Sequence, residues 1–143
     1  CALCVMHMQG EPRTMQADPR YQDVVAEVHG FLAQRVAAAQ AAGIARERII
    51  VDPGFGFGKR LEHNLALLRQ LHRFGDLGAC VLAGLSRKSM LGEITGRKVS
   101  QRDTASVVAA LLAARNGARI LRVHDVAATK DALAVWMAVD NQG

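Results

Sequence analysis

Four short apolar segments of this chain each end in side chains that can do chemistry. An aspartate, lysines, an arginine and histidines stand at these ends, in residues 5–7, 51–59, 85–88 and 122–125. Such a set suits an anionic substrate that also offers hydrogen-bonding edges. Because each segment precedes a helical pattern, we expect the four groups to gather at the carboxyl ends of parallel strands, where a (β/α) barrel enzyme has its active site.

A glycine-rich stretch, residues 54–59, follows the second apolar segment. It is not a dinucleotide fingerprint, because Lys59 stands where the third glycine is needed, and it is not a P-loop, because Arg60 replaces the serine or threonine. Its glycines allow a tight loop whose backbone can approach a flat ligand, and a phenylalanine in the loop can supply a stacking face. The alternative is a loop that only turns the chain.

Asp52 and Lys88 are candidate site residues. Asp52 ends an apolar run, and its carboxylate can accept paired hydrogen bonds from an amino-pyrimidine edge. The alternative for Asp52 is a cap of the following turn. Lys88 comes just after the third run and can donate to a carbonyl or a ring nitrogen, or contact an anion. The alternative for Lys88 is a solvated surface lysine.

Arg122 and His124 are two residues apart, so on a strand they face the same side. An arginine on an apolar strand is costly unless it is paired. A guanidinium fork and an imidazole donor suit a phosphate group, whereas a structural pair of Arg122 with Asp125 or Asp52 is the alternative. His7 is expected to be a core residue. The other histidines are expected on helix surfaces: His29, His63 and His72.

A strand, loop and helix pattern repeats four times. Strands are predicted at 3–7, 49–51, 80–83 and 119–124. Helices are predicted at about 21–42, from 61, from 103 to 117 and at 126–139, with a short helix at 86–92 and a loop at 92–102. The helix residues expected to be buried are Val24, Val28, Phe31, Leu32, Val36, Ala39, Leu61, Leu65, Leu68, Leu71, Val107, Val108, Leu111, Leu112, Leu133, Trp136 and Met137.

This rhythm indicates an α/β fold with parallel strands and right-handed crossovers. Four βα units are half of a TIM (β/α)8 barrel, which typically needs about 250 residues. Four parallel strands alone also leave two unpaired edges. The chain starts at Cys1, inside a strand-like run and without an initiator Met. We therefore expect residues 1–143 to be one partial barrel domain whose other half lies upstream.

Composition disfavours several classes of function. No segment approaches the roughly 18 consecutive apolar residues of a membrane span, and no signal-peptide pattern is seen. The net charge is +5, but lysines and arginines are scattered and aromatic residues make up 4% of the chain, so nucleic-acid binding is not expected. The cysteines make no disulfide framework; they are expected to be buried thiols in a reducing cytoplasm, not a zinc site: Cys1, Cys4 and Cys80.

Together the motifs resemble the C-terminal half of bacterial dihydropteroate synthase. The matching stretches are Met-His-Met-Gln-Gly at 6–10, Asp-Pro-Gly-Phe-Gly-Phe-Gly-Lys at 52–59, Ser-Arg-Lys-Ser at 86–89 and Arg-Val-His-Asp-Val at 122–126. The resemblance extends over about residues 3–139. It implies the C-terminal half, with four βα units, of a TIM barrel of the pterin-binding class.

The resemblance also implies a reaction. The enzyme would join 6-hydroxymethyl-7,8-dihydropterin diphosphate to p-aminobenzoate, giving 7,8-dihydropteroate and diphosphate in folate biosynthesis. Lys88, Arg122 and His124 are the expected catalytic residues. Arg122 and His124, with the backbone at Val123 between them, would hold the diphosphate. Fixed cations at a leaving group stabilise the charge that builds there in the transition state.

Further substrate contacts are implied by the same resemblance. Asp52 would hydrogen-bond the pterin ring, while Lys88 would reach both the pterin and the aminobenzoate region. Ser89 would bind the aminobenzoate carboxylate, and sulfonamides that mimic it. Three more residues would line the pterin slot: Met6, Phe57 and Gly84.

Other parts of the family's site are expected outside this chain. The resemblance places an asparagine that contacts Mg²⁺, further pterin-binding groups and two mobile loops in the first half of the barrel. We therefore expect the isolated chain to have little or no synthase activity, and the full-length protein to be a cytoplasmic homodimer.

Two alternative functions remain open: a non-catalytic half-barrel that binds anions or assembles with a partner, and a pterin-dependent methyltransferase of the same barrel class. The motifs at 86–88 and 122–124 favour the synthase over the methyltransferase.

Overall fold

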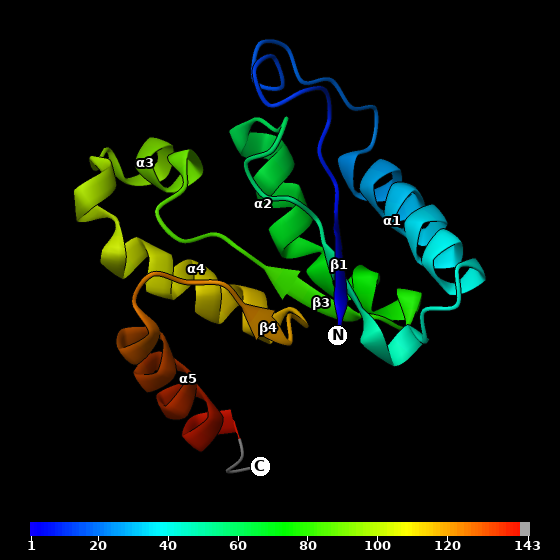
Figure 1. Ribbon diagram of the computed structural model, residues 1–143. Coiled ribbons are helices and arrows are strands. Elements are labelled where there is room, and N and C mark those ends of the chain that lie inside the picture. Colours follow the sequence, from blue (N-terminus) through cyan, green and yellow to red (C-terminus); the bar gives the residue numbers. More distant parts are fainter. Residues whose placement is uncertain (141–143) are drawn as a thin grey trace.

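Residues 1–140 are described by a computed structural model, in which four strands form one parallel sheet. The strands are β1 (Leu3–Met6), β2 (Ile49–Asp52), β3 (Cys80–Ala83) and β4 (Ile120–Leu121), and their order in the sheet is their order in the chain (Figure 1). Met6 pairs with Asp52, Val51 with Val81, and Ala83 with Leu121. Parallel neighbours need crossover connections, and here helices provide them, as the sequence predicts.

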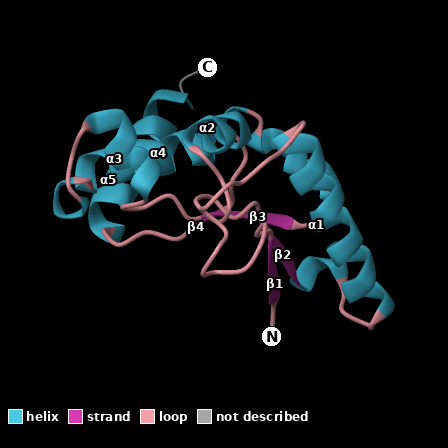
Figure 2. Cartoon of the chain, turned by 90° about the horizontal axis from the view of Figure 1, so that it is seen from above, coloured by secondary structure: helices cyan, strands magenta, loops and turns pink. Residues whose placement is uncertain are grey.

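The helices form an arc along one side of the strands (Figure 2). The α-helices are α1 (Val24–Ala41), α2 (Leu61–Arg69), α3 (Ser89–Thr95), α4 (Asp103–Arg115) and α5 (Val126–Asp140). The 3₁₀ helices are η1 (Arg46–Arg48), η2 (Leu71–Leu77) and η3 (Val99–Gln101). Among residues 1–140, no helix is both long enough and apolar enough to cross a membrane.

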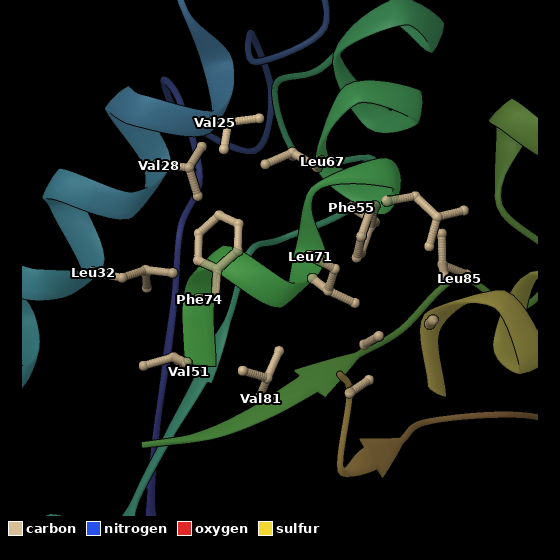
Figure 3. Packing of buried hydrophobic residues seen from close by; sticks show 14 of the residues in the cluster. Val25, Val28, Leu32, Val51, Phe55, Leu67, Leu71, Phe74, Val81 and Leu85 are labelled. Carbon is tan, nitrogen blue, oxygen red and sulfur yellow. The ribbon is translucent and has the colours of Figure 1, made fainter. Parts of the chain in front are cut away.

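Successive side chains of a strand point to opposite faces of the sheet, so residues with odd numbers share one face and those with even numbers share the other. Val51, Val81 and Ala83 are buried in the core against the helices. Figure 3 shows Val51 and Val81 close to Phe74 and Leu71 of η2. Residues at even positions in the strands must therefore point to the other face of the sheet, away from the helices. Asp52 is one of them.

The predicted first helix is confirmed. Asp23 caps α1, its carboxylate accepting a hydrogen bond from the backbone N–H of Ala26 at 3.0 Å. The stripe at Val24, Val28 and the positions that continue it is buried, whereas Phe31 is half-buried. On α2, Leu68 is buried, as is Leu71 of η2, whereas Leu61 and Leu65 are half-buried.

The predicted burial on α4 is wrong. Its buried residues are small, namely Ser106, Ala109, Ala110 and Ala113. Val108 is 51% exposed and Leu112 is 41% exposed, whereas Val107 and Leu111 are half-buried. Small side chains on the inner face let α4 lie close to the rest of the fold, and the larger apolar residues then point outward.

Several element bounds also differ from the predictions. The short helix α3 begins at Ser89 and continues to Thr95, into the predicted loop, which also contains η3. The strand β4 is only two residues long instead of six. Met137 on α5 is 53% exposed, while Leu133 and Trp136 are half-buried.

The expectation of buried thiols is wrong for two of the three cysteines. Cys1 and Cys4 are exposed, and Cys80 is half-buried. Cys4 lies on β1, an edge strand, and at an even position, so it points to the face of the sheet opposite the helices. All three cysteines are free thiols.

Candidate functional site

Asp52 lies at the carboxyl end of β2 and is almost completely buried, with 1% of it exposed. Its Oδ1 accepts a hydrogen bond from the backbone N–H of Gly54 at 2.8 Å, and its Oδ2 lies 3.2 Å from Nη2 of Arg122. The turn cap and the arginine pair, which the sequence left as alternatives, are therefore both present. Each uses one oxygen of the carboxylate, which leaves further lone pairs for a ligand.

Arg122 extends beyond β4 and still bonds to the sheet, since its backbone N–H donates to the carbonyl of Ala83 at 3.0 Å. Its guanidinium lies over Gly84, where an ideal Cβ would be 2.7 Å from Nη2. The side chain is 56% exposed, although its partner Asp52 is buried. Most of the five N–H donors of this guanidinium are therefore open to an anion.

Lys88 is half-buried, so the alternative of a fully solvated surface lysine is wrong. Its Nζ donates to the carbonyl of Phe55 and lies 4.4 Å from the centre of the Phe57 ring, a cation–π contact. Burial lowers the pKa of Lys88 to about 8, the Asp52 carboxylate raises this pKa, and the Arg122 guanidinium lowers it. Lys88 therefore lies within electrostatic reach of both members of the ion pair.

The glycine loop, residues 54–58, is held from several sides. Gly54 has a φ of +73°, and a Cβ there would collide with the carbonyl oxygen of His7. The backbone N–H of Gly56 donates to Oδ1 of Asn64 at 2.8 Å, and the Tyr21 hydroxyl donates to the carbonyl of Gly58 at 2.8 Å. These tethers fix the loop that places Phe57 on Lys88, so this segment does more than turn the chain.

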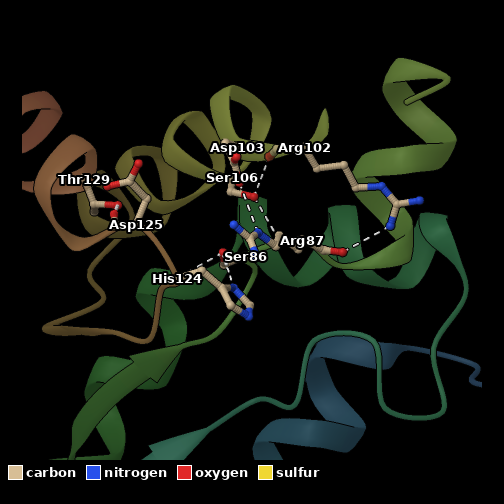
Figure 4. A network of polar contacts seen from close by, with 8 residues as sticks. All are labelled: Ser86, Arg87, Arg102, Asp103, Ser106, His124, Asp125 and Thr129. Atoms are coloured by element: carbon tan, nitrogen blue, oxygen red, sulfur yellow. Dashed lines mark hydrogen bonds and ion pairs between the residues drawn. The ribbon is translucent and has the colours of Figure 1, made fainter. Parts of the chain in front are cut away.

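His124 does not extend the strand face of Arg122, because β4 ends at Leu121. Its Nδ1 lies 2.8 Å from the hydroxyl of Ser86, and its backbone N–H donates to the same oxygen at 3.3 Å (Figure 4). Among the described residues, no side-chain hydrogen bond joins His124 to Arg122. The two candidate anion ligands thus both follow β4 but have different partners, Asp52 for Arg122 and Ser86 for His124.

A network that the sequence analysis missed holds the segment before Lys88 (Figure 4). Arg87 has a φ of 60°, the only positive φ of a non-glycine residue among those described. Its backbone N–H donates to the hydroxyl of Ser106 at 2.9 Å, and its Nε lies 3.0 Å from Oδ1 of Asp103. Arg102 donates to the carbonyls of Arg87 and Lys88 at 3.1 and 3.2 Å. Asp103, the first residue of α4, thus pairs with Arg87.

The remaining predicted site residues differ in how far they are buried. Met6 is half-buried and pairs with Asp52 in the sheet, and Val123 is half-buried. Ser89 is exposed at the start of α3 and lines a hollow of about 430 Å³ with Lys59 and Glu93. Lys88 and Arg122 do not line that hollow.

The histidines agree with their predicted positions only in part. His7 is buried in the core, as expected. His72 is exposed, whereas His29 and His63 are half-buried, with His29 lying 2.6 Å from Asp76 and His63 accepting the backbone N–H of Arg60. Within residues 1–140, no group of three or more His, Cys, Asp or Glu side chains could hold a metal ion.

Comparison with known proteins agrees with this geometry. A family model described as pterin binding enzyme matches residues 1–124. The chain belongs to the pterin-binding enzyme family. The matched range includes the carboxyl ends of all four strands, from Met6 at the end of β1 to His124 after β4.

Relatives of this pterin-binding chain are dihydropteroate synthases. The chain is 54% identical over 139 residues to the enzyme of Haemophilus influenzae, and 55% identical over 141 residues to that of Neisseria meningitidis serogroup B. These matches cover 97% and 96% of this chain but 50% of each relative. The chain therefore spans about half the length of the curated relatives it matches.

Solved structures confirm the predicted fold class. Dihydropteroate synthase from Stenotrophomonas maltophilia, with imidazole bound in its active site, superposes with a TM-score of 0.96 at 59% identity, over 99% of this chain and 54% of that chain. The Xanthomonas albilineans enzyme in complex with 7,8-dihydropteroate has a TM-score of 0.90 at 54% identity, over 97% and 50%. This member of the pterin-binding family thus has the fold of half a TIM barrel.

Proposed function

We propose that residues 1–143 are the C-terminal half of a dihydropteroate synthase and supply the pterin and diphosphate contacts of its active site. The observation that carries this proposal is the Asp52–Arg122 pair, in which a buried carboxylate holds an exposed guanidinium beside Lys88. The carboxylate can accept hydrogen bonds from the pterin edge. The guanidinium can hold the diphosphate at the other end of the same substrate.

In the proposed reaction, the amine nitrogen of p-aminobenzoate attacks the methylene carbon of 6-hydroxymethyl-7,8-dihydropterin diphosphate. A C–N bond forms, the C–O bond to diphosphate breaks, and its electron pair leaves with the diphosphate. The amine releases a proton. Arg122 and His124 stabilise the charge that builds on the leaving group, and Lys88 orients the pterin and the aminobenzoate. No protein nucleophile takes part.

The substrates proposed for this chain are supported by complexes of similar proteins. Solved structures include the Xanthomonas albilineans enzyme with 4-aminobenzoic acid and the Thermus thermophilus enzyme with 6HMPPP. A sulfonamide complex is known for the Yersinia pestis enzyme, which is 41% identical to this chain. We extend sulfonamide binding to this protein, with Ser89 at that end of the site.

The residues described here do not suit Mg²⁺. Asp52 is the carboxylate that pairs with Arg122 and acts on Lys88, and a single carboxylate that already forms an ion pair makes a poor Mg²⁺ site. Residues 1–140 also offer no cluster of three or more His, Cys, Asp or Glu side chains that could hold the ion. If the reaction uses Mg²⁺, its protein ligands belong outside this part of the enzyme.

An apolar groove supports a homodimer as part of the proposal. The groove has a volume of about 610 Å³ and lies between α2, α3 and α4, where Leu65, Ile94, Val108 and Leu112 line it. Ile94, Val108 and Leu112 are exposed, and large apolar patches of this kind mark interaction sites. The three free thiols fit a reducing compartment, and we place the enzyme in the cytoplasm.

The test is calorimetric titration of the full-length protein with the pterin diphosphate. We expect Arg122→Ala to weaken binding at least tenfold, and the matched control Arg119→Ala, an exposed arginine just before the opposite end of β4, to change it less than twofold. Circular dichroism checks that each variant is folded. Equal binding by Arg122→Ala and wild type would refute the role of Arg122, and absence of binding by folded wild type would refute the proposed substrate.

A further inference from the structure

Lys59 is a buried lysine that the proposed reaction does not use. Only 3% of the residue is exposed, and its Nζ has three neighbours: the carbonyl oxygen of Gly54 at 2.9 Å, the carbonyl oxygen of Phe57 at 3.0 Å and Nδ1 of His7 at 3.0 Å. An ammonium group has three N–H donors and no acceptor. The three neighbours therefore match its hydrogen-bonding capacity completely.

These three acceptors come from two different strand ends. His7 follows β1, and its backbone N–H donates to the carbonyl of Asp52 at 3.0 Å. Gly54 and Phe57 begin and close the turn of the glycine loop, since the backbone N–H of Phe57 donates to the carbonyl of Gly54 at 3.1 Å. Lys59 thus joins the end of β1 to the loop after β2, at the two residues that define its turn.

The glycine loop held by Lys59 contacts Lys88 of the candidate site. The carbonyl of Phe55 accepts from Lys88, and the Phe57 ring lies against the same ammonium group. Both contacts belong to the segment whose ends Lys59 holds. We propose that Lys59 is a positioning residue: it fixes the glycine loop against β1, and the loop in turn sets Phe57 and Lys88 for the pterin substrate.

Burial of a lysine is costly, which favours a specific role over simple packing. Burial lowers the pKa of Lys59 to about 7, while Asp52 raises this pKa and Lys88 lowers it. A methionine has a similar length but no N–H donor. At position 59 it would leave the Phe57 carbonyl without its lysine partner, and the loop would lose its link to His7.

The inference rests on the proposed function for its substrate, but its first test does not need the substrate. Amide hydrogen exchange of the full-length protein compares Lys59→Met with wild type and with Lys98→Met, a matched change at an exposed lysine. We expect the amides of Gly56 and Phe57 to exchange at least tenfold faster in Lys59→Met only. The amides of Val51 and Val81 in the core strands should keep their rates.

The kinetic test separates positioning from a general loss of stability. In Lys59→Met we expect KM for the pterin diphosphate to rise about tenfold, with kcat changed less than threefold and KM for p-aminobenzoate less affected. A uniform loss of kcat with unchanged KM would overturn the proposal. If folded wild type binds no pterin diphosphate, the proposed function fails, and the exchange rates alone decide whether Lys59 fixes the loop.

A measurement on the wild-type protein tests the hydrogen bonds of Lys59 even if Lys59→Met does not fold. With ¹⁵N-labelled lysine, the Nζ protons of Lys59 should exchange with water far more slowly than those of exposed Lys98 and Lys130. Slow exchange supports the three hydrogen bonds. Exchange as fast as that of the two exposed lysines, or unchanged loop amides in a folded Lys59→Met, would overturn the proposal.

Discussion

Nη2 of Arg122 lies 3.2 Å from Oδ2 of Asp52, and it occupies space that a side chain at position 84 would need. The pair is asymmetric, because the carboxylate is buried and the guanidinium is exposed. The Asp52 carboxylate can therefore face a ring that enters the site, while the Arg122 guanidinium reaches toward the solvent. The absence of a side chain at Gly84 leaves room for the guanidinium next to the end of β3.

Gly84→Ala tests this packing directly. The new Cβ would lie 2.7 Å from Nη2 and 3.1 Å from Nε of Arg122, so the guanidinium must shift, and we expect its pairing with Asp52 to weaken. We expect about tenfold weaker binding of the pterin diphosphate, which corresponds to about 1.4 kcal/mol. Titration calorimetry measures it. Gly30→Ala is the control, because nothing lies within 4 Å of a Cβ there; equal affinities of the two variants would contradict the prediction.

Asp52→Asn removes charge while keeping an oxygen that can accept the N–H of Gly54. We expect the free energy of unfolding to fall by about 1–3 kcal/mol, because the buried amide cannot replace the ion pair. The Asp52 carboxylate raises the pKa of both Lys59 and Lys88. In the variant the pKa of Lys88 should therefore drop below about 8. NMR titration of ¹⁵N-labelled lysine measures this shift; an unchanged pKa of Lys88 would show that the carboxylate does not act on it.

Acid should destabilise the fold through His7. The pKa of His7 is lowered to about 4, chiefly by burial and also by the Lys59 ammonium, whereas Glu27 acts to raise it. Between pH 6.5 and pH 4 the unfolded chain thus binds more protons at this residue, so stability rises with pH across that window and is lost as pH falls through it. We expect a loss of about 2 kcal/mol, measured by urea unfolding.

His7→Asn is the matched variant for that experiment. Its amide oxygen can accept from Lys59 but does not titrate between pH 4 and 6.5. The pH slope of its unfolding free energy should therefore be smaller than that of wild type in this window. Equal slopes would exclude His7 as the source of the acid sensitivity.

The apolar groove between α2, α3 and α4 gives a prediction about assembly. Val108→Asp places a charge on a residue that is 51% exposed, so it should cost the monomer little. In a homodimer that buries this groove, the same charge should raise the dissociation constant at least a hundredfold. Sedimentation equilibrium of the full-length protein measures it. Ala37→Asp, on an exposed position of α1, is the control and should dissociate like wild type.

Residues 1–143 alone should lack synthase activity. The proposed site uses groups from one half of a barrel, and the chain spans about half of its curated relatives. Diphosphate release from the purified chain with both substrates should stay at background. Joining the chain to the N-terminal half of the Haemophilus influenzae relative should restore release, and activity of the chain alone would disprove the prediction.

The sequence predicted most of the sheet correctly, and three of its candidate site residues lie near one another in the structure. Short apolar runs located β1, β2 and β3, and the charged residues at or after the strand ends pointed to Asp52, Lys88 and Arg122. The inner face of α4 was missed for a physical reason. Residues 105–114 are almost all apolar, so the pattern has no polar side to show which of two apolar stripes is buried.

Contacts between distant residues could not be predicted in this way. Ser86 and His124 are 38 positions apart, and neither the alternation of a strand nor local spacing brings them together. The positive φ of Arg87 depends on Ser106, which holds its backbone N–H from another element. The burial of Lys59 was hidden for the same reason, because its partner His7 lies 52 residues earlier.

The alternation of the β2 side chains has a consequence for how this protein tolerates insertions. Adding one residue to β2 directly after Ile49 would move each later side chain of this strand to the opposite face of the sheet. Asp52 would then be driven into the helix-covered core, and Val51 would face Arg122 in its place. Loops such as residues 8–20 can change in length without this penalty. Natural length variation should therefore collect in the loops and be absent from the strand that ends at Asp52.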